Sequence, residues 1–209
     1  MPGTASRKRT RLEPEVRRGQ ILAAVSRLVV EEGLAALTME RLARDVGISK
    51  ALVYNYYASR EALLEALLQR EQDDLRGRGM AAALRAESFE DLIRQTTRLY
   101  LEQIRDRGAL IATITADPTV AQSLEAVSRV ERARTIRYFA RMTSRAFDLA
   151  PDVAATCVDM LMTVTGSAGR LVAEGRIEAA AATDLCVTLI TGALERAAGK
   201  PASPLHEAG

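Results

Sequence analysis

The stretch TMERLARDVGISKALVYNYY, residues 38–57, decides the fold of the first part of this chain. The helical spacing of its apolar residues predicts two short helices, over 39–46 and 50–56, separated by Gly47. Each helix follows a hydroxyl side chain, Thr38 or Ser49, that can accept a hydrogen bond from an otherwise unpaired backbone N–H. Two short helices joined through a tight glycine turn have the geometry of a helix-turn-helix.

This predicted helix-turn-helix has an apolar side and a polar side. The side chains expected to pack the two helices together and against the rest of the domain are Leu42, Ala43, Val46, Ile48, Val53 and Tyr57. The second helix then presents cationic, amide and phenol groups outward, with small or apolar side chains between them. We expect this outward face to consist of Ser49, Lys50, Ala51, Leu52, Tyr54, Asn55 and Tyr56.

Such a face has the chemistry of a reader of the DNA major groove. Lysine binds guanine or phosphate, asparagine binds adenine, tyrosine binds phosphate oxygens, and an apolar side chain contacts the thymine methyl group. The alternative from the residues alone is a small helical subdomain in which the tyrosine cluster is only core and rim.

The segments on either side extend the helical pattern. Residues 14–32 carry apolar positions on one helical face, and Gly33 is expected to end that helix. Ser59 is placed to cap another helix that begins at Arg60. The start of that helix contributes four core leucines, Leu63, Leu64, Leu67 and Leu68.

From Arg17 to Leu68 many positions match one known pattern in order. The residues are Arg-x-x-Ile-Leu-x-Ala, then Glu-x-Gly-x-x-x-x-Thr-Met-x-x-Leu-Ala-x-x-x-Gly-Ile-Ser-Lys, then Val-Tyr-x-Tyr-Tyr-x-Ser-Arg-Glu-x-Leu-Leu. This segment resembles the DNA-binding domain of the tetracycline-repressor (TetR/AcrR) family. The resemblance covers about a quarter of the chain.

The resemblance implies roles for single residues. Thr38 corresponds to the family's phosphate-contacting cap, Lys50 and Tyr54 to DNA-contact positions, and Arg60 to a phosphate-binding cation. The predicted DNA-binding set is therefore Thr38, Ser49, Lys50, Ala51, Leu52, Tyr54, Asn55, Tyr56 and Arg60. Leu52 stands where the family often has threonine, which puts the operator sequence in doubt, and Tyr57 replaces the usual phenylalanine.

Charge is distributed unevenly along the 209 residues. Residues 1–60 hold 11 Lys and Arg against 6 Asp and Glu, whereas the formal net charge of the whole chain is only +2. A basic front end suits a polyanionic partner. The run Arg7-Lys8-Arg9-Thr10-Arg11 either lies along DNA phosphates or is a solvated tail. No signal peptide or transmembrane segment is apparent, so we expect a cytoplasmic protein that does not bind membranes.

The sequence argues against an enzyme and against cofactor or metal chemistry. The chain has one histidine, His206, in its tail, and neither a Ser-His-Asp set nor a glycine-rich phosphate loop occurs. A paired-carboxylate site drawn from Asp159, Glu174 and Asp184 stays open as the enzymatic alternative. Cys157 and Cys186 lack metal-ligand spacing and are expected to be reduced, buried thiols.

Beyond the first 60 residues the chain also reads as helical throughout. A break or kink is expected at residues 76–79, then a helix from Ser88 to about Arg107 that Gly108 ends. Three further helices are expected over 119–149, 151–173 and 177–198.

In the resembling family this part binds a small molecule and forms the dimer. The middle helices offer apolar walls with scattered hydroxyls, suited to a small, largely apolar effector. The predicted ligand-binding residues are Thr96, Tyr100, Gln103, Ile111, Thr113, Ile114, Tyr138 and Met142. The last two helices carry apolar stripes too wide for one neighbour, which favours a homodimer through a four-helix interface over a purely intramolecular core. The predicted interface residues are Val153, Cys157, Leu161, Val164, Leu185, Leu189 and Ala193.

The sequence thus predicts an all-α protein: an N-terminal three-helix helix-turn-helix DNA-binding domain followed by a larger helical ligand-binding and dimerisation domain. The expected divisions are a flexible basic arm (1–13), the DNA-binding domain (14–58), the ligand-binding and dimerisation domain (59–198) and a flexible tail (199–209). The expected function is a ligand-responsive repressor that binds a palindromic double-stranded DNA operator as a dimer. An architectural DNA-binding protein without a ligand is the main alternative.

Overall fold

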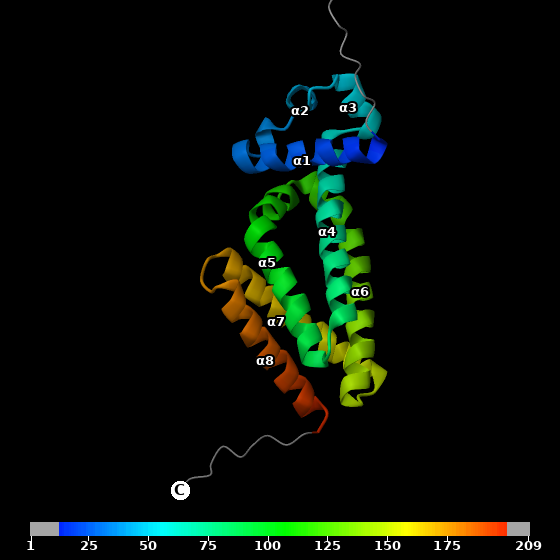
Figure 1. The fold of residues 1–209 in the computed structure, drawn as a ribbon, viewed down its shortest axis with the longest axis vertical. Helices are drawn as coiled ribbons and strands as arrows, with labels where there is room; N and C mark the ends of the chain where they lie inside the picture. Colours follow the sequence, from blue (N-terminus) through cyan, green and yellow to red (C-terminus); the bar gives the residue numbers. More distant parts are fainter. Residues whose placement is uncertain (1–12, 200–209) are drawn as a thin grey trace, which may run out of the picture. The chain divides into compact units, whose positions relative to one another are not determined.

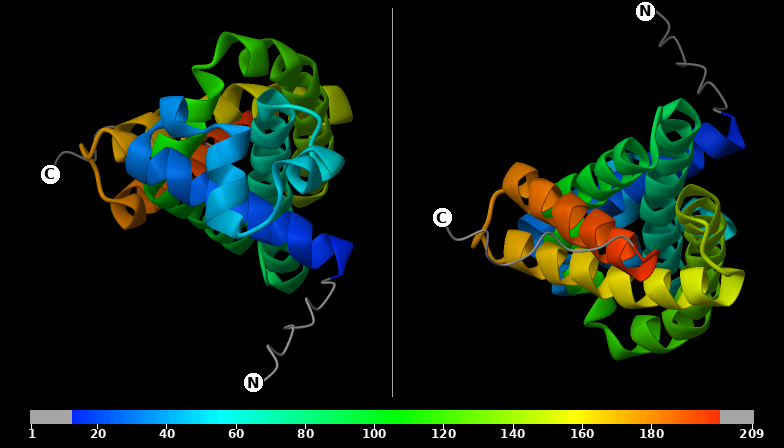
Figure 2. Two further views of the ribbon diagram at one scale, coloured as in Figure 1. Left: turned by 90° about the horizontal axis from the view of Figure 1, so that it is seen from above. Right: turned by 90° about the horizontal axis from the view of Figure 1, so that it is seen from below.

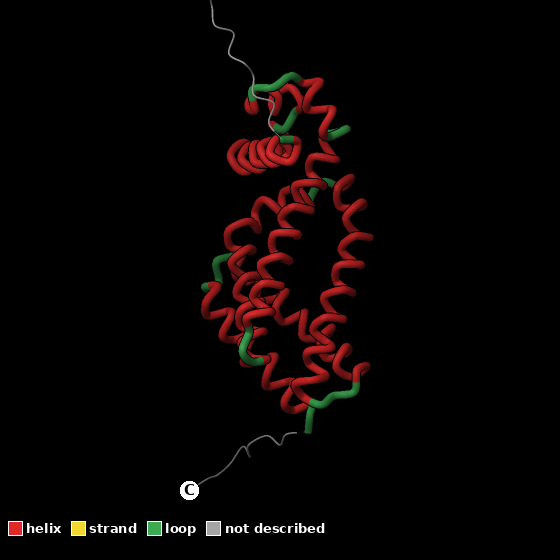
Figure 3. Tube along the Cα trace, turned by 45° about the vertical axis from the view of Figure 1, so that its right-hand side comes forward, coloured by secondary structure: helices red, strands yellow, loops and turns green. Residues whose placement is uncertain are grey.

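Every regular element between residues 13 and 199 is a helix, and no strand occurs in that range (Figures 1 and 3). The computed structural model describes these residues, apart from the side chains of 122–128. The all-α prediction is confirmed. The elements are α1 (Pro14–Glu32), the 3₁₀ helix η1 (Leu34–Ala36), α2 (Met39–Val46), α3 (Lys50–Tyr56), α4 (Arg60–Arg85), α5 (Phe89–Thr115), α6 (Pro118–Phe147), α7 (Pro151–Ala173) and α8 (Ala179–Ala197).

The described residues form two compact units, which divide between Leu68 and Gln69. The division falls inside α4, ten residues later than the domain boundary expected between residues 58 and 59. The start of α4 belongs to the first unit because its leucines are fully buried there. These are Leu63, Leu64, Leu67 and Leu68. The same continuous helix therefore supplies residues to both units.

The core of the first unit is built from one face of α1 together with the inner sides of α2, α3 and early α4. Ile21 and Val25 of α1, Leu42 of α2 and Val53 of α3 have no exposed surface. Such side chains bring about 1.5–3 kcal/mol each on burial. α2 and α3 are too short to be stable alone, so this packing holds them in place.

The second unit is a bundle in which segments far apart in sequence pack together. α5 lies beside α8 and α7, and α7 packs along both α6 and α8 (Figures 1 and 2). One buried cluster joins Ile93 of α5 to Cys186 and Ile190 of α8. Phe89 of α5 and Phe147 of α6 meet edge to face with ring centroids 5.0 Å apart.

Two glycine-based predictions for helix ends are wrong. α4 runs through residues 76–79 without a break, and α5 passes through Gly108 to Thr115. A glycine inside a helix costs about 1 kcal/mol relative to alanine. In α5 this cost is offset because Leu110 and Ile114, beyond the glycine, are buried. The last helix begins at Ala179 rather than Ile177 because Gly175, with φ +66°, turns the chain after α7.

An ion pair fastens the second unit's part of α4 to α5. Arg107 donates two hydrogen bonds to the Glu71 carboxylate, at 2.7 and 3.0 Å, and the Gln103 amide donates to the Glu71 carbonyl at 3.1 Å. Burial raises the pKa of the Glu71 carboxyl, but Arg107 and Arg70 outweigh it and hold that pKa below its ordinary value of 4.5. Glu71 therefore stabilises the folded chain in its ionised form.

We expect Glu71→Gln to lower the free energy of unfolding at pH 7 by up to about 1 kcal/mol, since the pair is partly solvent-screened. A group with a depressed pKa stabilises above its unfolded pKa, and this contribution is lost as pH falls through the folded value. The difference in the free energy of unfolding between wild type and variant should therefore close below about pH 4. Urea unfolding of both proteins at pH 7 and at steps from pH 5 to 3 measures this difference. Glu87→Gln, an exposed carboxylate near the end of α4, is the control, and an equal loss at every pH would contradict the prediction.

Candidate functional site

The turn between α2 and α3 is fixed by backbone geometry. Gly47 adopts a left-handed conformation, φ 71° and ψ 36°, which side-chain-bearing residues rarely adopt. The Ile48 N–H bonds the Ala43 carbonyl at 2.9 Å, and the Gly47 N–H bonds that of Arg44 at 3.1 Å. This pairing closes the end of α2 and aims the chain into α3.

Both helices begin at the hydroxyl caps expected from sequence. Thr38 Oγ1 accepts from the Arg41 backbone N–H at 3.1 Å, and Ser49 Oγ accepts from the Leu52 N–H at 3.2 Å. With Gly47 between the caps, the two-helix geometry follows from local residues alone. Val53 and Tyr57 are buried on the inner side of the α3 segment.

The opposite face of α3 is open to solvent. Ser49, Lys50, Ala51, Tyr54 and Asn55 are exposed. Leu52 and Tyr56 are half-buried, and the Arg18 guanidinium of α1 lies 5.5 Å from the centre of the Tyr56 ring. The face therefore combines a cation, an amide and a phenol over one stretch of two turns, which is what base and phosphate contacts require.

Lys50 is held by an acid in the DNA-free chain. Its ammonium pairs with the Glu40 carboxylate of α2 and lies 5.8 Å from the centre of the Tyr54 ring. The hydrogen bond to Glu40 raises the pKa of Lys50, and the same bond lowers the pKa of Glu40. Lys50 thus carries its charge at neutral pH, and a polyanion must compete with Glu40 for it.

The other cations of this unit are also partly engaged. Arg60 donates to the Leu34 carbonyl at 3.3 Å, which ties the start of α4 to η1. Arg41 pairs with both Glu32 and Asp45. Thr38 is exposed beside these groups. The arm of residues 7–11 lies outside the described residues.

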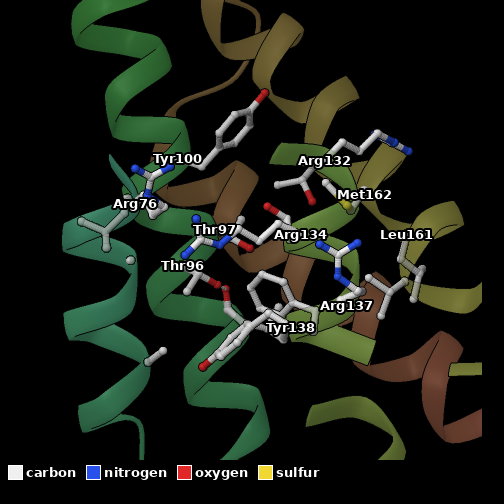
Figure 4. A pocket seen from close by; sticks show the side chains of 18 of the residues that line it. Arg76, Thr96, Thr97, Tyr100, Arg132, Arg134, Arg137, Tyr138, Leu161 and Met162 are labelled. Atoms are coloured by element: carbon white, nitrogen blue, oxygen red, sulfur yellow. Dashed lines mark hydrogen bonds between the residues drawn. The ribbon is translucent and has the colours of Figure 1, made fainter. Parts of the chain in front are cut away.

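A second feature is a cavity of about 780 Å³ in the second unit. Its walls come from α4, α5, α6, α7 and α8, and Figure 4 shows its side chains projecting toward one another from these helices. Most of the lining is apolar, with hydroxyl side chains between. The apolar part includes Leu75, Met80, Ile93, Phe139, Leu161 and Ile190.

Charged side chains also line this cavity, a feature that sequence reasoning missed. The arginines are Arg76, Arg132, Arg134, Arg137 and Arg141, and the single acid is Glu131. Scattered arginines along α6 look like an ordinary solvated face in the sequence. Only the placement of α6 against the other helices shows that this face borders a cavity.

Comparison with known proteins supports the first of these sites. Residues 21–67 match the family of bacterial regulatory proteins described as the tetR family. The match contains the entire helix-turn-helix. Over these residues the chain is similar to tetR-family DNA-binding domains. The match is to regulatory proteins, which agrees with the expectation that the chain is not an enzyme.

Relatives of this chain are similar to it over part of its length. It is 38% identical over 84 residues to the HTH-type transcriptional activator FasR of Mycolicibacterium smegmatis, covering 40% of this chain and 38% of that one. It is 34% identical over 130 residues to the HTH-type transcriptional regulator BetI of Rhizobium meliloti, covering 60% and 57%. The chain thus spans between about two fifths and three fifths of the length of these relatives.

The fold extends further than the sequence similarity. A TetR-like transcriptional regulator from Rhodococcus sp. RHA1 superposes with a TM-score of 0.68 at 23% identity, over 88% of this chain and 98% of that one. At this identity the likeness concerns the fold alone. In the described part of the chain no helix has the length and apolar character that crossing a bilayer demands.

The structure brings only part of the predicted ligand set to the cavity. Thr96, Tyr100 and Tyr138 line it. The other five do not: Gln103 is buried and bonded to Glu71, Ile114 is fully buried in the core, Thr113 is exposed, and Ile111 and Met142 are half-buried outside the lining. Ile111, Thr113 and Ile114 lie outside this lining because α5 continues past Gly108 to Thr115.

The predicted interface residues divide into two groups. Val153, Leu185, Leu189 and Ala193 are exposed, the first three by 42%, 55% and 57%. Cys157, Leu161 and Val164 are half-buried and pack against the internal cluster of α5 and α8. Met160, 67% exposed on α7, is an apolar side chain that the sequence reasoning did not include.

We expect Lys50→Ala to weaken binding to a selected DNA site by about 1–3 kcal/mol, the usual cost of a lost base or charged contact. Gel-shift titration at fixed salt measures it, with the site taken from enrichment of random DNA. Arg85→Ala, which removes the same charge at the far end of α4, is the matched control and should change affinity little. Equal affinities for Lys50→Ala and Arg85→Ala would contradict the assignment of α3.

Proposed function

We propose that this chain is a dimeric transcriptional regulator of the TetR family that binds a palindromic operator and leaves it when a small molecule occupies the cavity. The observation that carries the proposal is the exposed face of α3, positioned by the Gly47 turn in a unit that matches the family. The cavity in the other unit supports the ligand-responsive part.

In this proposal α3 enters the major groove of double-stranded DNA. Lys50 and Asn55 contact base edges, and Leu52 offers an apolar contact to a thymine methyl group. Thr38, Tyr54 and Arg60 contact phosphates, and Ser49, Ala51 and Tyr56 complete the docking surface. Because Lys50 is paired with Glu40 in the free chain, DNA binding includes an exchange of one anionic partner for another.

The dimer is proposed to form through α7 and α8. Leu185 and Leu189 are one helical turn apart on α8, each more than half exposed, and Ala193 continues the same face. Covering large apolar side chains of this kind is the usual driving force of stable homodimers. A twofold dimer would present two copies of α3 to two half-sites.

α4 is proposed as the link between ligand and DNA. Its first part contributes buried leucines to the DNA-binding unit, and Gln72, Arg76 and Met80 farther along line the cavity. A ligand that displaces this helix would change the separation of the two α3 helices, which must match half-sites about 34–36 Å apart. A few ångströms of displacement then makes simultaneous docking costly.

The cavity favours this proposal over an architectural DNA-binding role, which needs no internal space of drug size. The regulator is proposed as a repressor when its operator overlaps a promoter, because ligand binding then frees the promoter. The name of the FasR relative describes an activator, so the direction of regulation depends on where the operator lies. Action on chromosomal DNA places the protein in the cytoplasm.

We expect Leu189→Glu to convert the dimer into monomers because it places a charge in the proposed apolar interface. The weight-average mass in sedimentation equilibrium should fall by half at micromolar concentration. Affinity for the palindromic site should fall far more than affinity for a single half-site. Ala180→Glu, which places the same charge at an exposed position on the side of α8 opposite Leu189, is the control.

A wild-type chain that sediments as a monomer while binding the palindrome at full affinity would contradict the proposed dimer. A variant that stays dimeric would show that the interface lies elsewhere.

A further inference from the structure

We propose that the cavity selects an elongated amphiphilic carboxylate, with the acid at the arginines of α6 and the apolar body inside the bundle. This inference rests on the proposed ligand site and names the chemical class of the ligand, which sequence reasoning expected to be simply apolar.

The first support is a set of cations that the protein does not neutralise. Arg134, Arg137 and Arg141 are spaced by three and four residues, so they share one face of α6 and line the cavity. Among the described residues, Arg137 and Arg141 have no ion pair or hydrogen bond, and Arg134 comes only within 4.0 Å of Glu131. Like charges at this spacing repel.

The other two arginines of the cavity differ. Arg76 donates to Glu131 at 3.0 Å and also pairs with Asp73, and Arg132 pairs with Asp159 at 2.7 Å. They are already neutralised by carboxylates. The surplus positive charge therefore belongs to the face of Arg134, Arg137 and Arg141, whose side chains are exposed to solvent, and an anion bound there would replace water with a charged partner.

The second support is a pair of buried polar atoms without partners. Gln72 Oε1 and Thr143 Oγ1 are inaccessible to solvent and make no hydrogen bond within the described residues. Both residues line the cavity, and Thr143 is fully buried. A buried polar atom left unpaired costs about 1–3 kcal/mol, so such atoms commonly mark a place where a ligand or water binds.

The remaining lining residues indicate what the apolar part of the ligand is. Ile93, Phe139, Leu161 and Ile190 are apolar members of the same lining, and they pack in one hydrophobic cluster. Along α6 the lining extends from Glu131 to Thr143, which corresponds to about 18 Å of helix. Figure 4 shows Arg134 and Arg137 among the side chains of Thr97, Tyr138 and Leu161. An elongated apolar body ending in an acid fits this combination.

The test compares dodecanoate with 1-dodecanol by isothermal calorimetry on the full DNA-free chain, below the micellar concentration of either. The two probes share the same chain and differ only in the charge of the head group. We expect dodecanoate to bind about tenfold more tightly than the alcohol, since several partly exposed cations act together. A third probe, dodecyltrimethylammonium, should bind most weakly.

Variants assign the preference to the arginines. Arg134→Gln with Arg137→Gln should remove the tenfold preference and leave the affinity for 1-dodecanol unchanged. Arg145→Gln, an exposed cation of α6 outside the cavity, is the matched control and should keep it. Thr143→Val should weaken both the acid and the alcohol, because it removes the buried hydroxyl but no charge.

Equal affinity of acid and alcohol for the wild type, no binding of either, or an unchanged preference in the double variant would overturn the inference. These measurements are made without DNA. A negative result would therefore count against the ligand class without testing the proposed DNA-binding function. If dodecanoate binds as expected but never weakens operator binding, the ligand class stands and the proposed release mechanism falls.

Discussion

The continuity of α4 is the constraint on which the rest of the structure depends. One helix, Arg60–Arg85, gives four buried leucines to the unit that holds α3 and cavity-lining residues to the other unit. Gly77 and Gly79 lie within it without ending it, and Glu71 fastens it to Arg107 of α5. In the proposed mechanism, a displacement of the cavity-lining part of this helix is transmitted to the leucines at its start.

The two candidate sites treat positive charge in opposite ways. In the helix-turn-helix, Lys50 pairs with Glu40 and Arg41 pairs with Glu32 and Asp45, so acids partly neutralise these cations, of which Lys50 is a proposed DNA contact. DNA must displace these acids, which weakens binding to any duplex and leaves more of the discrimination to base contacts. In the cavity, Arg137 and Arg141 lack such partners among the described residues, and a bound anion would supply them.

The helix-turn-helix could be predicted from sequence to the residue because its determinants are local. Thr38 and Ser49 cap their helices, and Gly47 alone allows the left-handed turn between them. The end of α5 could not be predicted from sequence, because burial of Leu110 and Ile114 overrides the local signal of Gly108. For the same reason Thr113 and Ile114 lie outside the cavity lining. Gln103 also lies outside it, and its amide bonds the carbonyl of Glu71, 32 residues away in the sequence. The sequence does not show that arginines of α6 line the cavity, because this depends on how α6 packs against the other helices.

The central claim is that cavity and operator are coupled, and reciprocal titration tests it most directly. The affinity for dodecanoate is measured with the free dimer and with the operator-bound dimer, and the operator affinity is measured with and without saturating dodecanoate. Linkage requires both affinities to fall by the same factor, which we expect to be about 5–150-fold. Identical dodecanoate affinity in the free and operator-bound protein would contradict the account.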